Sequence, residues 1–431
     1  METSDNPELL DRTRLEQILR AAVKQGASDV HFKAGERVLM RVQGMLHGLN
    51  LPRLTPADTE SLYESLRPDH LNEVSAQDLK EADFSFAVQG AGRFRVNAFR
   101  QRGSVALVVR VIPIRIPNFK ELNLPDSLIE ISQMNRGLVL VTGTTGSGKS
   151  TTLAAMINLI NKTRTLHVIT IEDPIEFLFL NERSSVVQRE LGTDTSTFAS
   201  ALRAALRQDP DVIMIGEMRD TETIDIALKA AETGHLVLST AHTTDAAKTI
   251  HRLLSVFPLS EQQMVRYRLS ESMRAIISQR LLPTADQSGL IPAVEVMIAT
   301  RIIQDLIRLP DRTFEITEFI GKGKNYGMQT FDQSLMRLYK SEKITKDAAM
   351  AAATSPADFD LQLRLGVDED DDLELDHHNY GQMPDDAELE LAQSNPSGDP
   401  SADPPQPAGE KAPASQSAES APASTKEDPA S

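Results

Sequence analysis

At 431 residues, the chain is long enough for two domains with full hydrophobic cores and for a further segment. It has no cysteine, which excludes disulfides, thiolate zinc sites, iron–sulfur clusters and a cysteine nucleophile. The formal charge of −17 is concentrated in residues 366–431, which hold 17 acidic residues and two lysines, so residues 1–365 carry only about −2. A nearly neutral body lacks the net basic charge expected of a nucleic-acid-binding protein.

The first 22 residues contain no apolar run of the signal-peptide type. Apolar stretches elsewhere fall short of the roughly 18 residues that a membrane-spanning helix needs. The sequence therefore predicts a cytoplasmic protein, one that is still free to dock on a membrane complex.

Residues 10–115 follow an N-terminal extension, residues 1–9, and show short apolar or alternating segments typical of strands. These segments are "SDVHF", "RVLMRVQG", "ADFSFAV", "GRFRVNAF" and "SVALVVRVIP". They predict a small α/β sheet domain. Three prolines in "PIRIPNFKELNLPDS" then favour an extended linker, which we assign to residues 116–124.

Residues 125–365 form the second predicted domain. From Gly137, strand-like and helix-like segments alternate as far as "HLVLSTAH", which predicts a parallel sheet covered by helices. A mainly helical region is expected from there to about residue 360, because Leu269, Met273, Ile276 and Ile277 have helical spacing. The tail, residues 366–431, has nine prolines and many acidic, alanine and serine residues, and it predicts disorder.

The segment "GTTGSGKS" fits the phosphate-binding P-loop pattern, and it lies between a predicted strand and a predicted helix. In such loops, backbone amides and the helix N-terminus bind phosphate, the lysine contacts the outer phosphates, and the serine holds Mg²⁺. The sequence therefore predicts ATP and Mg²⁺ as ligands. The predicted binding residues are Gly143, Thr144, Thr145, Gly146, Ser147, Gly148, Lys149, Ser150 and Thr151.

Acidic residues follow two later strands. Glu217 ends "DVIMIGE", where an acid commonly lies beside the magnesium ion and its water. Glu172 and Glu176 belong to "HVITIEDPIEF", and a strand next to the P-loop strand would bring them near the γ-phosphate. The alternative is that these acids only cap loops.

Two histidines, His235 and His242, lie at opposite ends of "HLVLSTAH". A single histidine is more often structural than catalytic. Of the two, His242 at the carboxyl end of the strand is better placed to sense the γ-phosphate.

Several long segments in order resemble the secretion-superfamily ATPases, and more narrowly the PilT/PilU-type motors that retract type IV pili. They are "GTTGSGKSTT", "TIEDPIEF", "LRAALRQDPDVIMIGEMRDTETIDIALKAAETGHLVLSTAHTT" and "KTIHRLLSVFP". The resemblance spans about residues 10–355. It implies a PAS-like N-terminal domain, a RecA-like P-loop ATPase domain, and a homohexamer that acts on an inner-membrane pilus platform protein, with a paralogous motor ATPase as a further partner.

The resemblance also implies roles for particular residues. It selects Glu176 over Glu172 as the catalytic acid and Glu217 as the Walker B acid, beside Ser150 at the metal. It adds His235 and His242 to the nucleotide site. Arginines of the N-terminal domain complete the site across the ring, and others come from the helix before Glu217. The matching arginines are Arg95, Arg110, Arg203 and Arg207.

One segment departs from the family pattern. Where retraction motors commonly have "AIRNLIRE", this chain has "IIQDLIRL", with Gln304 and Leu309 in place of Arg and Glu. An accessory, PilU-like role is therefore the nearest alternative to retraction. Pilus extension motors typically carry a four-cysteine zinc site, which this chain lacks.

Rivals from other classes are a RecA-type nucleic-acid translocase, a nucleotide-binding scaffold without turnover, and a GTPase. The near-neutral body opposes the translocase, and no nucleic acid is expected as a partner. The GTPase is opposed by "NKTR" at Asn161–Arg164, which lacks the aspartate of a guanine-reading element. We expect a cytoplasmic ATPase, peripherally associated with the inner face of the membrane through the pilus machine.

Overall fold

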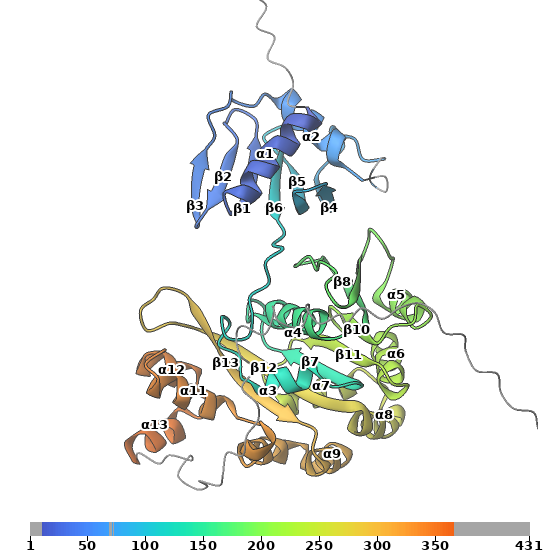
Figure 1. Ribbon diagram of the computed structural model, residues 1–431, viewed down its shortest axis with the longest axis vertical. Coiled ribbons are helices and arrows are strands. Elements are labelled where there is room, and N and C mark those ends of the chain that lie inside the picture. Colours follow the sequence, from blue (N-terminus) through green and yellow to red (C-terminus); the bar gives the residue numbers. More distant parts are fainter. Residues whose placement is uncertain (1–10, 69–70, 72, 366–431) are drawn as a thin grey trace, which may run out of the picture. The chain divides into compact units, whose positions relative to one another are not determined.

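The computed structural model describes residues 11–68, 71 and 73–365. The predicted extension, residues 1–9, and the predicted disordered tail, residues 366–431, lie outside the described residues. The described chain forms two sheets with helices, which confirms the predicted α/β class with two sheet domains (Figure 1). The predicted domain and linker boundaries stay predictions.

The N-terminal sheet is antiparallel, with strand order β3-β2-β1-β6-β5-β4. All five segments predicted as strands take part. Strand β3 was not predicted, because each of its four residues is exposed and it has no alternating apolar pattern. The strands are β1 (Ala27–Lys33), β2 (Leu39–Val42), β3 (Met45–Gly48), β4 (Glu81–Val88), β5 (Gly92–Gln101) and β6 (Ser104–Val111).

Two helices, α1 (Arg12–Lys24) and α2 (Pro56–Leu66), share one hydrophobic core with this sheet. Helix α2 begins at a capping box formed by Thr55 and Asp58, with Pro56 in its first turn. The buried residues of α1 recur at helical spacing. They are Leu15, Ile18, Leu19 and Ala22.

The second sheet has the strand order β13-β12-β7-β11-β10-β8-β9. Neighbouring strands are parallel except for β13, which is antiparallel to β12. The strands are β7 (Gly137–Thr142), β8 (His167–Glu172), β9 (Ser185–Glu190), β10 (Val212–Ile215), β11 (Leu236–Ala241), β12 (Met273–Pro283) and β13 (Leu290–Ile298).

Helices cover both faces of this sheet, as predicted. Along β7, Leu138 and Leu140 join the core that contains α6 (Thr221–Glu232), because alternate side chains of a strand point to opposite faces. Val139 and Val141 join the core with α4 on the other face. The remaining helices are α3 (Ser127–Ser132), α4 (Lys149–Thr163), α5 (Phe198–Ala205), α7 (Ala246–Ser255), α8 (Leu259–Ser272), α9 (Arg301–Arg308), η2 (Pro310–Glu315), α10 (Ile316–Gly321), η3 (Lys324–Tyr326), α11 (Phe331–Lys340), α12 (Lys346–Ala352) and α13 (Pro356–Leu365).

The prediction of helix around Met273, Ile276 and Ile277 is wrong, because these residues lie on β12. Only Leu269 is helical, in α8. Strand β12 lies between β7 and β13 and is covered on both faces, so it has apolar residues at consecutive positions, Ala275, Ile276 and Ile277. A continuous apolar run contains helical spacings by chance, and periodicity alone does not separate the two structures.

The expectation that the strand carrying Glu172 lies next to the P-loop strand is also wrong. Strands β11 and β10 separate β8 from β7. Glu176 lies beyond the end of β8, and the segment after that strand returns towards α4. Among the residues that the structure describes, no helix has both the length and the apolar character needed to cross a membrane.

Candidate functional site

The P-loop segment, residues 143–150, runs from the end of β7 into the first turn of α4, as predicted. Gly143 and Gly148 have φ angles of 146° and 90°, a region that favours glycine. A Cβ atom at Gly143 would lie 2.4 Å from Ser147 Oγ and 2.6 Å from the carbonyl oxygen of Gln279. Only glycine therefore fits where the chain leaves β7, and the loop leads directly to the amide-rich N-terminus of α4.

Lys149, the first residue of α4, is buried. Its Nζ donates hydrogen bonds to the carbonyl oxygens of Gly143 and Thr144, each at 2.9 Å. Burial lowers the pKa of the Lys149 ammonium, and the negative charges of Glu176 and Glu217 oppose that shift. One cation and two carboxylates therefore act on one another at this site.

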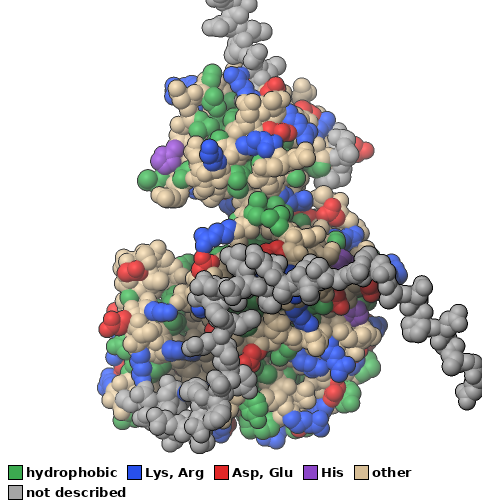
Figure 2. Space-filling view, in the orientation of Figure 1, with side chains coloured by type: hydrophobic (Ala, Val, Ile, Leu, Met, Phe, Trp, Pro, Cys, Tyr) green, Lys and Arg blue, Asp and Glu red, His purple; other side chains and the backbone are tan. Residues whose placement is uncertain are grey.

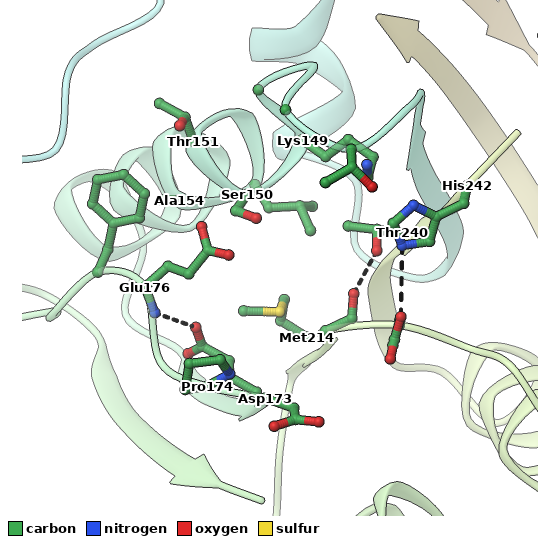
Figure 3. A pocket seen from close by; sticks show the side chains of 18 of the residues that line it. Lys149, Ser150, Thr151, Ala154, Asp173, Pro174, Glu176, Met214, Thr240 and His242 are labelled. Atoms are coloured by element: carbon green, nitrogen blue, oxygen red, sulfur yellow. Dashed lines mark hydrogen bonds and ion pairs between the residues drawn. The ribbon is translucent and has the colours of Figure 1, made fainter. Parts of the chain in front are cut away.

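A cavity of about 570 Å³ opens over the P-loop. Figure 3 shows Glu176 pointing into it towards Ser150, with His242 on another side. Most of the predicted site residues within the P-loop domain line this cavity. They are Thr145, Gly146, Gly148, Lys149, Ser150, Thr151, Glu176, Glu217 and His242.

The two glutamates at the end of β8 have different surroundings. Glu172 is buried, and its carboxylate accepts hydrogen bonds from the Thr170 hydroxyl at 2.7 Å and the Gln188 amide at 3.1 Å. It also accepts one from the backbone N–H of Glu176 at 3.4 Å (Figure 3). Burial raises the pKa of Glu172 in spite of these hydrogen bonds. Glu172 thus holds the turn that presents the exposed Glu176 to the cavity.

Glu217 lies two residues beyond the end of β10, at the carboxyl edge of the sheet. Its Oε2 is 2.6 Å from Arg219 Nε and 3.6 Å from His242 Nε2. Thr240 donates a hydrogen bond of 2.6 Å to the carbonyl oxygen of Gly216 and so fixes the ends of β10 and β11 together. This arrangement brings an acid and a histidine from neighbouring strands to one wall of the cavity.

The residues predicted to hold Mg²⁺ fit that ion. Ser150 offers a hydroxyl and Glu217 a carboxylate, and both line the cavity. Magnesium ions in nucleotide sites are held by oxygen ligands, typically one or two from the protein and the others from phosphate and water. Among the described residues, no cluster of three or more acidic, histidine or cysteine side chains forms a self-contained metal site. The oxygen donors therefore suit a cation that arrives with phosphate.

Arg95 and Arg110 are directly opposite each other on β5 and β6, so their side chains leave the same face of the N-terminal sheet. The guanidinium Nε of Arg110 donates a hydrogen bond of 2.9 Å to the buried Asp29 on β1. Neither arginine lines the cavity within one chain.

The predicted helix before Glu217 is present as α5, but the prediction that it includes Arg207 is wrong, because α5 ends at Ala205. Asp209 has a φ of 53° and precedes Pro210, and a residue before proline is disfavoured in the helical region. Arg203 forms an ion pair with Glu222 on α6, and neither Arg203 nor Arg207 lines the cavity.

His235 lies before β11, at the opposite end of that strand from His242. Its Nδ1 is 2.9 Å from the carbonyl oxygen of Ala230 and 3.2 Å from Thr233 Oγ1. Within one chain, His235 therefore contacts the end of α6 and not the cavity.

Sequence reasoning missed the apolar wall of the cavity. Phe177 and Phe179 were visible in "DPIEFLF" but were not assigned a role, and distant segments supply the others. The apolar side chains of this wall include Phe177, Phe179, Phe198, Met214 and Leu281.

A family model described as type II/IV secretion system protein matches residues 5–317. The chain is 46% identical over 343 residues to the type IV pilus retraction ATPase PilT of Pseudomonas aeruginosa, covering 80% of this chain and 99% of that one. It is 39% identical over 386 residues to the type IV pilus ATPase PilU of the same organism, covering 89% and 98%. A crystal structure of the pilus retraction motor PilT with bound ADP superposes with a TM-score of 0.71, at 48% identity, covering 80% of this chain and 98% of that one.

Proposed function

This chain belongs to the type II/IV secretion system protein family, a family of ATPases, as its motifs predicted. On that premise we propose that it is a Mg²⁺-dependent ATPase that powers type IV pilus retraction and twitching motility. The observation that carries the proposal is the convergence of Lys149, Glu176 and Glu217 on one cavity at the carboxyl ends of parallel strands. The process, pilus retraction, comes from the relatives, which this chain matches over nearly their whole length.

The P-loop performs the binding step. Its backbone amides and the N-terminus of α4 face the phosphates of ATP, and Lys149 compensates their charge. Lys149 already lies on the Gly143 and Thr144 carbonyl oxygens, so its ammonium is held at the loop before nucleotide arrives.

The carboxylates perform the hydrolytic step. Glu176 orients the attacking water and accepts its proton, while the bond from the γ-phosphorus to the bridging oxygen breaks to give ADP and phosphate. Ser150 and Glu217 would hold Mg²⁺, which supplies neutralising charge to the phosphate oxygens when bound. His242, 3.6 Å from Glu217, lies where it can respond to the γ-phosphate.

A homohexameric ring accounts for the four predicted arginines and for His235, which do not line the cavity within one chain. In such a ring, Arg95 and Arg110 reach the nucleotide of a neighbouring subunit. Guanidinium groups on one face of a sheet are well suited to bind phosphate. Arg203, Arg207 and His235 would act at the same subunit boundary. Hydrolysis then changes the angle between the two domains and moves an inner-membrane platform protein.

An accessory, PilU-like motor is the second candidate. It is favoured by the "IIQDLIRL" segment and by the 39% identity to PilU over 89% of this chain. A paralogous motor would then be a partner in the same machine. In either role the protein would work in the cytoplasm at the inner face of the membrane.

The rivals from other classes are opposed by specific features. On the face shown in Figure 2, Lys and Arg side chains are interspersed with acidic ones, unlike the continuous basic channel of a nucleic-acid translocase. The Asn161 side chain, needed for guanine reading in a GTPase, is hydrogen-bonded to the backbone of Leu180 and Glu182.

Deletion of the gene tests the proposed process. A retraction motor predicts cells that carry many pili but do not twitch, and the parental chain should restore twitching. Bald cells would instead indicate an assembly motor. Normal pili with weakened twitching under load would favour the accessory role.

A further inference from the structure

Three buried polar side chains lie side by side across β7, β12 and β13. Thr142, Ser278 and Glu295 are paired in register, and none is more than 2% exposed. The Thr142 hydroxyl donates to Ser278 Oγ at 3.1 Å, and the Ser278 hydroxyl donates to Glu295 Oε1 at 3.2 Å. The same Oε1 accepts a hydrogen bond of 2.9 Å from the backbone N–H of Ala246. A continuous chain of hydrogen bonds thus runs from β7 to α7.

Each end of this chain is close in sequence to residues that line the nucleotide cavity, Thr145 at one end and His242 at the other. Thr142 is the last residue of β7 and directly precedes Gly143, the first P-loop residue. Ala246 is the first residue of α7, four positions after His242. The chain therefore fixes the segment that carries His242 relative to the P-loop, although Glu295 itself does not line that cavity.

We propose that Glu295 is a positioning residue for ATP hydrolysis: it holds the start of α7, and with it His242, against the end of the P-loop strand. This inference rests on the proposed ATPase function. Glu295 contacts neither the nucleotide nor the reacting atoms and acts through Ser278 and Ala246.

A carboxylate at this position demands an explanation beyond packing. Burying an ionisable group is unfavourable unless its contacts compensate, and a neutral acceptor would satisfy the Ala246 N–H. Helix α7 already has an N-cap, because Asp245 accepts a hydrogen bond from the Lys248 N–H at 2.8 Å. A negative charge at the start of this helix strengthens the link, because it interacts with the helix dipole and makes charge-assisted hydrogen bonds.

The surroundings make that charge sensitive to pH. The pKa of Glu295 is raised to about 7: burial and the charge of Asp245 raise it, and the Ala246 N–H, the Ser278 hydroxyl and Arg280 partly oppose that rise. Glu295 also borders a second cavity of about 740 Å³. The other charged and titratable residues that line this second cavity are Asp245 at the N-cap of α7, Lys248 and His251 of α7, Arg266 of α8, Arg280 of β12 and Asp332 in the first turn of α11.

The test compares steady-state ATP hydrolysis by the full chain and by Glu295→Gln between pH 6 and pH 8.5. Glutamine keeps the size and one acceptor oxygen but cannot ionise. We expect similar kcat values at pH 6, where Glu295 is protonated, and a roughly fivefold deficit for the variant at pH 8.5, where the parental carboxylate accepts stronger hydrogen bonds. KM for ATP should stay within about twofold in both, since the P-loop is intact.

Two further variants separate positioning from packing. Ser278→Ala breaks the chain at its centre, so its effect at pH 8.5 should be non-additive with that of Glu295→Gln. Ser334→Ala is the matched control: Ser334 Oγ accepts a buried hydrogen bond of 3.1 Å from Val294, next to Glu295 on β13, but has no link to α7. It should lower thermal stability without changing the pH profile of kcat.

The outcomes are distinct. A ratio of parental to Glu295→Gln kcat that does not change with pH would overturn the inference alone, as would the same pH-dependent loss in Ser334→Ala. A parental chain that shows no hydrolysis at any pH would overturn the proposed function and the inference with it.

Discussion

Exchanging each of the two glutamates after β8 for glutamine should separate catalysis from structure. Glu176 is exposed to the cavity, whereas Glu172 is buried beneath the turn. Glu176→Gln removes the group that accepts the proton of the attacking water and leaves the fold intact. General-base catalysis contributes typically about 10²–10⁴-fold, so kcat should fall by that factor while ADP binding stays nearly unchanged.

Glu172→Gln should instead lower the stability of the fold more than it lowers turnover. The Glu172 carboxylate accepts from three donors, the Thr170 hydroxyl, the Gln188 amide and the Glu176 N–H. A glutamine side chain places an NH₂ group, itself a donor, where the carboxylate oxygen accepted a hydrogen bond. The unsatisfied buried donors lower the free energy of unfolding by about 2 kcal/mol. For a domain of this size that lowers Tm by roughly 4–8 °C. Turnover should fall about tenfold at most, because Glu176 is present but held less firmly.

The assay is phosphate release at saturating Mg²⁺ and ATP at pH 8, with binding of a fluorescent ADP analogue and thermal denaturation measured on the same samples. An alkaline pH favours the ionised form of Glu172, which matters because burial raises the pKa of that carboxyl group. Parental turnover in Glu176→Gln together with a loss of more than 100-fold in Glu172→Gln would refute the assignment.

Three further predictions concern binding, assembly and stability. Lys149→Ala should weaken binding of the ADP analogue by tenfold or more, because Lys149 is the buried cation of the P-loop; unchanged affinity would place the nucleotide elsewhere. Arg95→Ala and Arg110→Ala should each lower kcat although neither lines the cavity, and mixing Arg110→Ala with Lys149→Ala chains should restore activity if the arginine acts in a neighbouring subunit; no recovery in mixed rings would contradict that arrangement. The free energy of unfolding of Glu295→Gln should rise relative to that of the parent between pH 5 and pH 8, by up to about 3 kcal/mol. The reason is that the pKa of Glu295 is raised from 4.5 to about 7 in the folded chain. The protonated Glu295 therefore stabilises the parent fully below pH 4.5, and this stabilisation is lost as pH rises through 7. Equal differences at both pH values in urea denaturation would show that Glu295 is not buried as an acid.

Local patterns predicted the elements that carry the site. The P-loop, the apolar face of α4 and the strand before Glu217 each depend on a short stretch of sequence, and each lies where the sequence indicated. Leu153 and Met156 on α4 are buried against the sheet. A helix that is covered on one face repeats apolar residues at helical spacing, and this spacing can be read from the sequence.

Features that depend on tertiary context escaped prediction. The helical spacing of Met273 and Ile276 arose in a strand buried on both faces, where apolar residues occupy consecutive positions such as Ala275, Ile276 and Ile277. Strand order was not readable, since nothing local to β8 shows that β10 and β11 intervene between it and β7. The Thr142–Ser278–Glu295 chain joins residues more than 130 positions apart, and only strand register brings them together.

The central claim, that the cavity hydrolyses ATP, is tested most directly by the rate of phosphate release from ATP by the full chain and by Glu217→Gln. Glutamine keeps the size of the side chain and removes only its charge. The account predicts that the parental chain hydrolyses ATP, that chelation of Mg²⁺ abolishes the reaction, and that Glu217→Gln still binds ATP but turns over at least about 100-fold more slowly. Absence of hydrolysis by the parental chain, or parental turnover in Glu217→Gln, would contradict it.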